Sequence, residues 1–344
     1  MSIILLLAIV TGMLLSCEKA PEKFSEYSFD YFDTATSIVG YETSREKFDS
    51  RAKEILTMLG EYHRLYTIYN SYDDVINLCT LNKTKGKEER TINADARIIE
   101  MLEYARDIYT KTSEKVNVAM GSVLSIWHDY REEGMDEPWN AQLPPMDRLK
   151  AAAEHTDIEM LQIDKDAMTV TLLDSEMTLD VGAIAKGYAV EMIARTLEAE
   201  GVTGYVLNVG GNVRTIGTKP GGEGWKVGIE NPDREAEDGY LEYLSLKGQA
   251  LVTSGSYQRY YTVDGVNYHH IIDPETLMPS DYFLSVSIVC SSSALGDALS
   301  TALFTMSLEE GRTLIASIPE AEAMWVEKDG TKHYSGGFRD YIVE

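Results

Sequence analysis

The chain has 344 residues, of which 44% are hydrophobic and 25% charged, so it can bury a sizeable core in one large domain or two intimate ones. Its 31 basic and 56 acidic residues give a net charge of −25, which argues against nucleic-acid binding, because that function depends on clustered lysine and arginine. No repeat of fixed period and no linker rich in Pro, Gly or Ser divides the sequence, so we expect one domain with subdomains.

The first predicted element is a signal peptide at residues 1–16. The stretch "MSIILLLAIVTGMLLSC" is apolar up to Ser16, short for a membrane span and of the right length for the apolar region of a signal peptide. Its ending, "LLSC", resembles a bacterial lipobox, in which the cysteine, here Cys17, is lipidated after cleavage. A tether at 17–26 would then hold the protein at the bacterial cell envelope, facing the periplasm or another extracytoplasmic side. An uncleaved anchor or a misplaced start is the alternative, since no Lys or Arg precedes the apolar run.

The first half of the predicted domain, which spans residues 27–344, mixes helices with short strands. Apolar periodicity predicts a helix over 46–63 and another within 91–113, with Asn93 as the N-cap of the second. The segment 117–133 is predicted as a turn followed by a helix. We further expect strands within 27–42 and at 158–164, 168–173 and 177–181, a loop at 131–147, and a short helix at 148–155.

The second half has many short strands and three predicted helices. The helices are expected at about 183–200, at 292–307 with a serine cap, and at 308–317. Strands are expected at 204–208, 225–230, 241–246, 250–253, 258–263, 267–272 and 284–290. This is an α+β pattern with mixed, largely antiparallel sheets and flanking helices, unlike the strict βαβ alternation of a Rossmann sheet.

The stretch "LDVGAIAKGYAVE" combines a glycine turn with a lysine at the start of a predicted helix. It matches neither G-x-x-x-x-G-K-[ST] nor G-x-G-x-x-G, the commonest phosphate-binding patterns. A strand that ends near Asp180 and a turn at Gly182 would free backbone groups at a helix start, which attract phosphate oxygens, and Lys186 adds a positive charge. A plain joint between a strand and a helix, with a surface lysine, is the alternative.

A second candidate site is "SALGDALSTALF", in which Asp297 and Thr301 are four residues apart and share one helix face. Small apolar residues surround them, so this face should be buried, and a buried carboxylate is costly unless it is paired or bound to a metal. A carboxylate beside a hydroxyl forms a half-site for Mg²⁺ that leaves room for waters and substrate phosphates. Alternatively, Thr301 bonds to a backbone carbonyl and Asp297 meets a lysine or arginine.

A third candidate is the strand "VNYHHIIDP", which places His269 and His270 on opposite faces, so that one of them should point inward. A histidine with a carboxylate close by, here Asp273, is suited to general-base work. A core histidine held by a backbone hydrogen bond is the alternative. The Gly-Gly turn of "YVLNVGGNVRTIG" adds a place where a ligand could approach the backbone closely.

Six stretches occur in the order seen in the ApbE family, which the chain resembles over roughly residues 30–310. They are "LDVGAIAKGYAVE", "LNVGGNVRTIG", "WKVGIENP", "LVTSGSYQRYY", "YHHIIDPET" and "GDALSTALF". The family consists of FAD:protein FMN transferases, which are often bacterial lipoproteins. The pattern departs from the family's at Leu277, where a glycine is usual, and at 32–34, where the family has "MGT" and this chain has "FDT".

The resemblance implies an ApbE-like α+β domain that uses Mg²⁺ to cleave the pyrophosphate of FAD and passes FMN to a Thr or Ser hydroxyl of an acceptor protein, with release of AMP. It implies metal binding by the Ala183 carbonyl, Asp297 and Thr301. His270 would be the base that activates the hydroxyl, and Lys186 would help to hold the phosphates. The implied FAD contacts are Phe32, Tyr69, Ala119, Met120, Gly121, Asp180, Lys186 and Ile271.

Two other functions fit the same residues. A metal-dependent FAD pyrophosphatase would use the same site and release FMN and AMP to water. A non-enzymatic flavin-binding or solute-binding lipoprotein would need no metal, and the pair Asp297 and Thr301 speaks against it.

Overall fold

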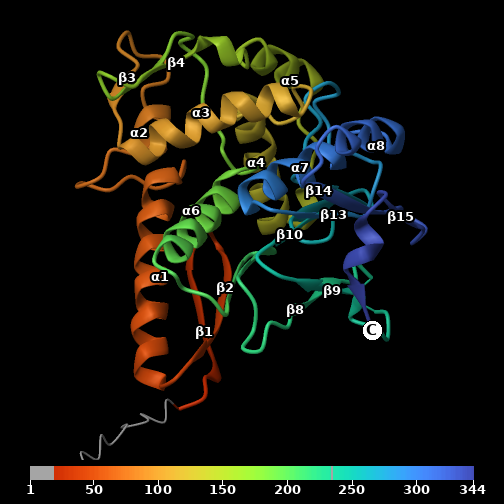
Figure 1. The fold of residues 1–344 in the computed structure, drawn as a ribbon. Helices are drawn as coiled ribbons and strands as arrows, with labels where there is room; N and C mark the ends of the chain where they lie inside the picture. Colours follow the sequence, from red (N-terminus) through yellow and green to blue (C-terminus); the bar gives the residue numbers. More distant parts are fainter. Residues whose placement is uncertain (1–18, 234) are drawn as a thin grey trace, which may run out of the picture.

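The computed structural model describes residues 19–233 and 235–344, which form the fold shown in Figure 1. The predicted signal peptide and the predicted lipidation site Cys17 lie outside these residues. Within the described ranges, no helix combines the length and the apolar character needed to cross a membrane. Strand β1 (Glu22–Tyr31) begins inside the segment predicted as a tether at 17–26, so residues 22–26 belong to a sheet instead.

Eight strands form the central sheet, in the order β1-β2-β6-β7-β10-β13-β14-β15, and all neighbouring strands are antiparallel. The inner strands β7 and β13 are buried along their whole length, because other elements cover both faces of the sheet. After β1, its strands are β2 (Thr34–Glu42), β6 (Tyr205–Val209), β7 (Asn212–Ile216), β10 (Ala250–Gly255), β13 (Ser285–Cys290), β14 (Ala321–Val326) and β15 (Lys332–Tyr334).

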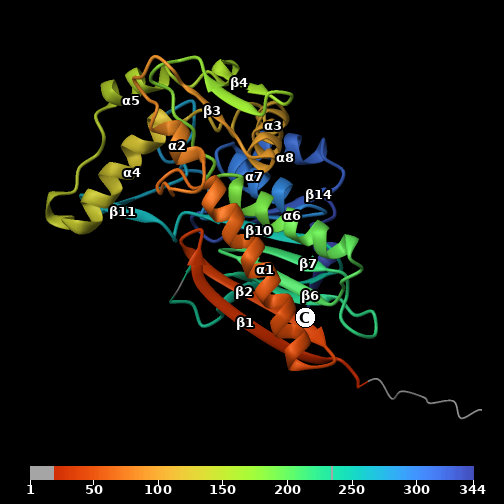
Figure 2. The same cartoon turned by 90° about the vertical axis from the view of Figure 1, so that its left-hand side faces the viewer.

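Helices cover one face of this sheet, as Figure 2 shows for α1 (Arg45–Tyr66) and α6 (Ala185–Ala199). Helix α7 (Ser293–Phe304) packs against α6 and against strands β10 and β13, and α8 (Leu308–Ala316) follows it. The predicted serine cap of α7 is confirmed, because Ser292 Oγ accepts a hydrogen bond from the Leu295 N–H. This packing buries α7 on nearly all sides and brings its Asp297 against α6.

A three-stranded sheet covers the other face, in the order β16-β9-β8. Its strands are β8 (Trp225–Glu230), β9 (Tyr240–Leu246) and β16 (Ile342–Val343), which follows the short 3₁₀ helix η3 (Phe338–Tyr341). Apolar side chains from both sheets, among them Leu244, Leu251 and Val289, form a second core between them. The central sheet is therefore a middle layer, with helices on one side and a small sheet on the other.

The remaining elements form a second lobe next to one end of the central sheet (Figure 2). It contains a sheet of order β3-β5-β4 and a hairpin of β11 and β12. Trp127 of α4 packs in one cluster with Tyr261 of β11 and with Leu277, so distant parts of the sequence meet here. The lobe comprises α2 (Leu78–Asn82), β3 (Thr91–Asn93), α3 (Ala96–Lys111), α4 (Gly121–Asp136), η1 (Pro138–Asn140), α5 (Met146–Ala153), η2 (Ile158–Met160), β4 (Leu161–Asp164), β5 (Thr169–Leu172), β11 (Tyr260–Val263) and β12 (Val266–His269).

The predicted α+β class with largely antiparallel sheets is confirmed, but some local predictions are wrong, among them the loop at 131–147, whose residues up to Asp136 belong to α4. Asp95 caps α3 by accepting the Arg97 N–H at 2.9 Å, whereas the predicted cap Asn93 ends β3. Residues 177–181 do not form the predicted strand. The Asn82 side-chain amide hydrogen-bonds to both the N–H and the carbonyl of Leu179, each at 2.8 Å, in place of a neighbouring strand. Only an isolated bridge from Thr178 to Met120 remains.

Candidate active site

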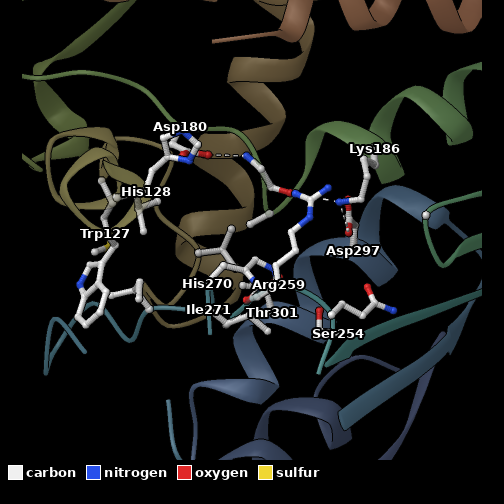
Figure 3. A pocket seen from close by; sticks show the side chains of 18 of the residues that line it. Trp127, His128, Asp180, Lys186, Ser254, Arg259, His270, Ile271, Asp297 and Thr301 are labelled. Carbon is white, nitrogen blue, oxygen red and sulfur yellow. Dashed lines mark hydrogen bonds and ion pairs between the residues drawn. The ribbon is translucent and has the colours of Figure 1, made fainter. Parts of the chain in front are cut away.

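A cavity of about 400 Å³ lies where turns of the central sheet meet the second lobe (Figure 3). Its lining residues range from Asp33 to Thr301, so segments far apart in the sequence meet there. Its charged lining residues are Lys115, Arg131, Lys186, Arg259, Asp33, Asp180 and Asp297. Four cationic groups among them make the cavity suited to an anionic ligand despite the acidity of the chain as a whole.

The stretch "LDVGAIAKGYAVE" forms a tight turn that leads into α6. The Asp180 carboxylate accepts the Gly182 N–H at 2.8 Å, and the Asp180 N–H donates to the Val118 carbonyl at the same distance. Burial raises the pKa of Asp180. Ala183 and Lys186 also line the cavity, so the structure places this turn at the cavity wall.

Asp297 joins α7 to the start of α6. It is 5% exposed, and its Oδ2 accepts the Gly187 N–H at 2.8 Å. Ile184, at the N-cap position of α6, makes no side-chain cap, so Asp297 acts as an acceptor for the helix from outside. Burial raises the pKa of Asp297, while Lys186, whose Nζ lies 3.9 Å from Asp297 Oδ1, opposes the increase. Thr301 lines the same cavity, as its predicted position on the Asp297 face requires.

The oxygen donors around Asp297 fit a hard divalent cation. Asp297, Thr301 and Ala183 all line the cavity, so a carboxylate, a hydroxyl and a backbone carbonyl are available there, and oxygen is the ligand type that Mg²⁺ prefers. No group of three or more His, Cys, Asp or Glu side chains that could hold a metal occurs in residues 19–233 and 235–344. A cation here would therefore depend on carbonyl, hydroxyl and ligand oxygens in addition to Asp297.

The close contact between α6 and α7 requires glycine at position 187. A Cβ atom there would lie 2.4 Å from Asp297 Cβ and 2.4 Å from the Ser293 carbonyl oxygen. We therefore expect Gly187→Ala to force the helices apart and to lower the free energy of unfolding by about 1–3 kcal/mol, as overpacked cores do. Urea denaturation of the purified variant measures this loss.

Gly336→Ala is the matched control, because a Cβ atom at that position meets nothing within 4 Å. This substitution should change the free energy of unfolding by less than about 0.5 kcal/mol. Equal stability of Gly187→Ala and the wild-type protein would show that the two helices can move apart freely.

His270 lines the cavity, whereas His269 is buried against the Ser280 carbonyl, which its Nε2 approaches to 2.7 Å. His269 is therefore the core histidine held by a backbone hydrogen bond, and His270 is the one that lies at the cavity. His270 Nδ1 lies 3.2 Å from the Arg259 carbonyl oxygen, which can only accept, so this nitrogen carries the proton. Burial, with a further contribution from the Arg259 charge, lowers the pKa of His270 to about 3. The imidazole is thus neutral at physiological pH, with Nε2 free to accept a proton.

Asp273 does not serve His270 as the sequence suggested. Its carboxylate forms a buried ion pair with Lys115, at 3.1 Å, and accepts the Glu275 N–H. Lys115 lies in the loop after α3 and also pairs with Glu275 at 2.7 Å. Asp273 therefore fixes the segment that follows His270 instead of acting on the histidine itself.

The depressed pKa of His270 predicts a loss of stability in acid. The unfolded chain takes up this proton below pH 6.5 and the folded chain only near pH 3, so the free energy of unfolding decreases as pH falls through this window. We expect wild-type protein to lose more stability between pH 7 and pH 4.5 than His270→Gln does. Urea denaturation at both pH values gives the difference. Parallel losses would indicate that the folded protein protonates His270 normally.

The predicted cofactor contacts divide into two groups. Tyr69, Met120, Asp180, Lys186 and Ile271 line the cavity. Phe32, Ala119 and Gly121 are not among its lining residues, and the Phe32 ring packs edge-on against His63 at 5.5 Å. Position 121 requires glycine for packing, because a Cβ atom there would lie 2.4 Å from the Thr178 carbonyl oxygen.

Several cavity residues carried no recognisable signal in the sequence. His128 and Arg131 of α4 contact each other at 2.8 Å, and the His128 ring packs against Tyr69. Arg259 sits within the quoted stretch "LVTSGSYQRYY" and donates to the Asp33 carbonyl at 3.3 Å. In Figure 3 its side chain extends across the cavity toward Lys186. The position of Arg259 inside a stretch that resembles the family was the only sequence signal that it belongs to the site.

Leu277, which stands where the ApbE pattern usually has glycine, adopts a φ of 60°. This left-handed conformation favours glycine, and other residues adopt it at a cost of about 1–2 kcal/mol. The Leu277 side chain is buried in the cluster with Trp127, whose Nε1 donates to the Leu277 carbonyl at 2.9 Å. The loop thus keeps the conformation that a glycine would adopt, and the packing of the leucine compensates.

The structure is thus an α+β protein with a cavity lined by four cationic side chains and a buried carboxylate. The model of the ApbE family matches residues 32–325, and the chain belongs to this family. The resemblance found in the sequence is thereby confirmed.

Several known proteins resemble this one over most of its length. A "FAD:protein FMN transferase" of Treponema pallidum is 30% identical over 304 residues, which cover 84% of this chain and 80% of that protein. One of Klebsiella pneumoniae is 27% identical over 286 residues, covering 82% and 83%. The crystal structure of the ApbE protein from Thermotoga maritima has a TM-score of 0.80 and 26% identity, covering 94% and 100%. The flavin transferase ApbE from Vibrio cholerae, at 23% identity and a TM-score of 0.75, supports the fold.

Proposed function

We propose that this protein transfers FMN from FAD to a Thr or Ser hydroxyl of an acceptor protein, in a reaction that depends on Mg²⁺ and releases AMP. The observation that carries the proposal is the meeting of Asp297, Lys186 and His270 in one cavity. These side chains come from three separate sequence motifs, and each has a distinct task in phosphoryl transfer. The names of the similar proteins support the same activity.

The oxygen atoms of Asp297, Thr301 and the Ala183 carbonyl would hold Mg²⁺, which supplies charge neutralisation at the FAD pyrophosphate. Lys186 and the backbone of the turn at Gly182 hold phosphate oxygens, because a lysine and a helix start both attract anions. Tyr69 is exposed at the cavity beside His128, where its ring can flank a flavin or adenine ring.

His270 acts as the base. The acceptor hydroxyl oxygen forms a bond to the FMN phosphorus, the bond from that phosphorus to the bridging oxygen breaks, and AMP leaves with the electron pair. The hydroxyl proton passes to His270 Nε2, which is unprotonated because Nδ1 donates to the Arg259 carbonyl. The nearby pyrophosphate charge favours the protonated imidazole and so strengthens this weak base during the reaction.

The test is incubation of the protein with FAD, Mg²⁺ and an acceptor domain that carries a Thr or Ser flavinylation site. We expect a fluorescent acceptor band in a denaturing gel and one AMP for each flavin transferred. EDTA, and an acceptor with alanine in place of the hydroxyl residue, should both abolish the band. A dark band with a competent acceptor would contradict the proposal.

The same assay separates the alternative activities. AMP release that needs no acceptor, and that does not change when acceptor is added, would indicate an FAD pyrophosphatase. FAD binding without turnover under any of these conditions would indicate a flavin-binding protein.

We also propose that the protein is anchored by a lipid on Cys17 and acts outside the cytoplasm. The proposal rests on the apolar segment that ends in "LLSC". Cys17→Ser should move the protein from the membrane fraction to the soluble fraction and abolish incorporation of labelled fatty acid. An unchanged membrane fraction would point to an uncleaved anchor.

A further inference from the structure

Asn212 is a buried amide of the cavity whose hydrogen bonding is incomplete. It is 1% exposed, and its amide nitrogen donates to Asp297 Oδ1 at 3.3 Å. Its amide oxygen is closed off from solvent and has no hydrogen-bond partner. Seven buried side-chain atoms in the described chain lack a partner, and of these only Asn212 Oδ1 belongs to a residue that lines the cavity. A buried acceptor without a partner costs about 1–3 kcal/mol, so folding alone does not account for this amide.

The turn between β6 and β7 places Asn212 next to Asp297. Gly210 and Gly211 both have positive φ values, 56° and 89°, which reverse the chain tightly. The Asn208 side chain fixes the turn by accepting the Gly211 N–H at 3.1 Å. Asn212 is the first residue of β7 and faces α7, while Asn208 is not among the residues that line the cavity. One asparagine therefore holds the turn, and the other points at the buried carboxylate.

We propose that Asn212 supplies an additional oxygen ligand to the cation that binds at Asp297, an inference that rests on the proposed function. A 180° turn of the amide about its last bond exchanges nitrogen and oxygen. The oxygen then lies about where the nitrogen was, near 3.3 Å from Asp297 Oδ1. Two such oxygens repel each other unless a cation lies between them.

The distance between the two groups suits this role. Octahedral Mg²⁺ holds its oxygens at about 2.0–2.1 Å, so neighbouring ligand oxygens are about 3 Å apart. A shift of a few tenths of an ångström would bring Asn212 and Asp297 to that spacing. Without the cation, the amide nitrogen faces the carboxylate and keeps it oriented, as side chains that surround a metal site commonly do.

The test measures binding of Mn²⁺ alone, followed by electron paramagnetic resonance, to the full chain without FAD or acceptor. Asn212→Leu keeps the size of the side chain and removes both its oxygen and its donor. We expect the dissociation constant for Mn²⁺ to rise about 10- to 100-fold in this variant. Asn212→Asp restores oxygen but not the N–H donor, and we expect it to bind Mn²⁺ at least as tightly as the wild-type protein does.

Asn208→Ala is the matched control, because it loosens the same turn without removing a cavity oxygen. It should leave Mn²⁺ affinity within about twofold of wild type. Unchanged affinity in Asn212→Leu, or no Mn²⁺ binding by the wild-type protein, would overturn the proposal. So would an Asn212→Asp variant as weak as Asn212→Leu, since this result would leave the amide N–H as the only contribution. Urea midpoints of all variants show whether each is folded.

Failure of this inference is distinct from failure of the proposed function. Wild-type protein that flavinylates an acceptor while Asn212→Leu binds Mn²⁺ normally would refute the role of Asn212 alone. Wild-type protein that binds Mn²⁺ through Asn212 but transfers no FMN would refute the proposed transferase activity, while the role of Asn212 as a metal ligand would stand.

Discussion

Asp297→Asn is expected to lower the rate of FMN transfer by at least about a thousandfold while leaving the protein as stable as wild type. The substitution removes the negative charge that the cation requires, and a single group that stabilises the charge of a transferring phosphoryl is worth about 10³- to 10⁵-fold in rate. The amide oxygen can still accept the Gly187 N–H, so the start of α6 keeps its outside acceptor. The rate of acceptor flavinylation at saturating FAD and Mg²⁺ measures the loss.

Asp297→Ala separates the two roles of this residue. It should be as inactive as Asp297→Asn but less stable by about 1 kcal/mol, the usual value of a lost helix cap. Wild-type rates in Asp297→Asn would show that the carboxylate serves only the helix. Equal stability of the two variants would show that the contact with Gly187 contributes nothing to the fold.

The second large effect is expected at the buried ion pair of Glu191 and Arg214. Glu191 on α6 is 2% exposed and Arg214 on β7 is 4% exposed, with 3.1 Å between Glu191 Oε2 and Arg214 Nε. Glu191 Oε2 also accepts the Ser293 N–H at 2.9 Å, which ties α6 to the start of α7. We expect Glu191→Leu to lower the free energy of unfolding by about 3–5 kcal/mol, because it leaves a buried guanidinium without its main counter-charge. Urea denaturation gives the value.

A double-mutant cycle isolates the pair. Arg214→Met should be similarly destabilising, whereas the combination of Glu191→Leu with Arg214→Met should recover much of the loss, since no buried charge is then left unpaired. Additive losses would contradict this, and would indicate that Glu198, which lies 3.1 Å from Arg214, and Arg195, which lies 2.9 Å from Glu191, already satisfy each charge separately.

Much of the fold could be predicted from local sequence, because caps and apolar periodicity act over a few residues. The serine before α7 and the alternation of the strand at β13 are signals of this kind. Residues 22–26 gave a weak signal, because an edge strand with mostly polar side chains resembles a linker. Residues 177–181 have strand-like composition, but a side chain 97 positions away, Asn82, binds the Leu179 backbone.

The site was predictable where its residues share one element. Asp297 and Thr301 lie one helical turn apart, so spacing alone put them on one face. Asp273 follows His270 closely in sequence, but its partner is Lys115, which lies 158 positions away and gave no local sign of the pairing. The same holds for Asn212 and Asp297, which are 85 positions apart and meet only when β7 packs against α7.

With Cys17 lipidated as proposed, strand β1 would limit how far the cavity can lie from a membrane. Figure 2 shows it running from the start of the described chain toward β11, and the turn after it carries Asp33 and Thr34 to the cavity. Its 10 residues span about 33 Å. With Cys17 lipidated as proposed, the chain before Glu22 adds at most about 17 Å. The enzyme would then serve only acceptor hydroxyls held within roughly 50 Å of the bilayer, and acceptors that are themselves membrane-bound would meet this condition most easily.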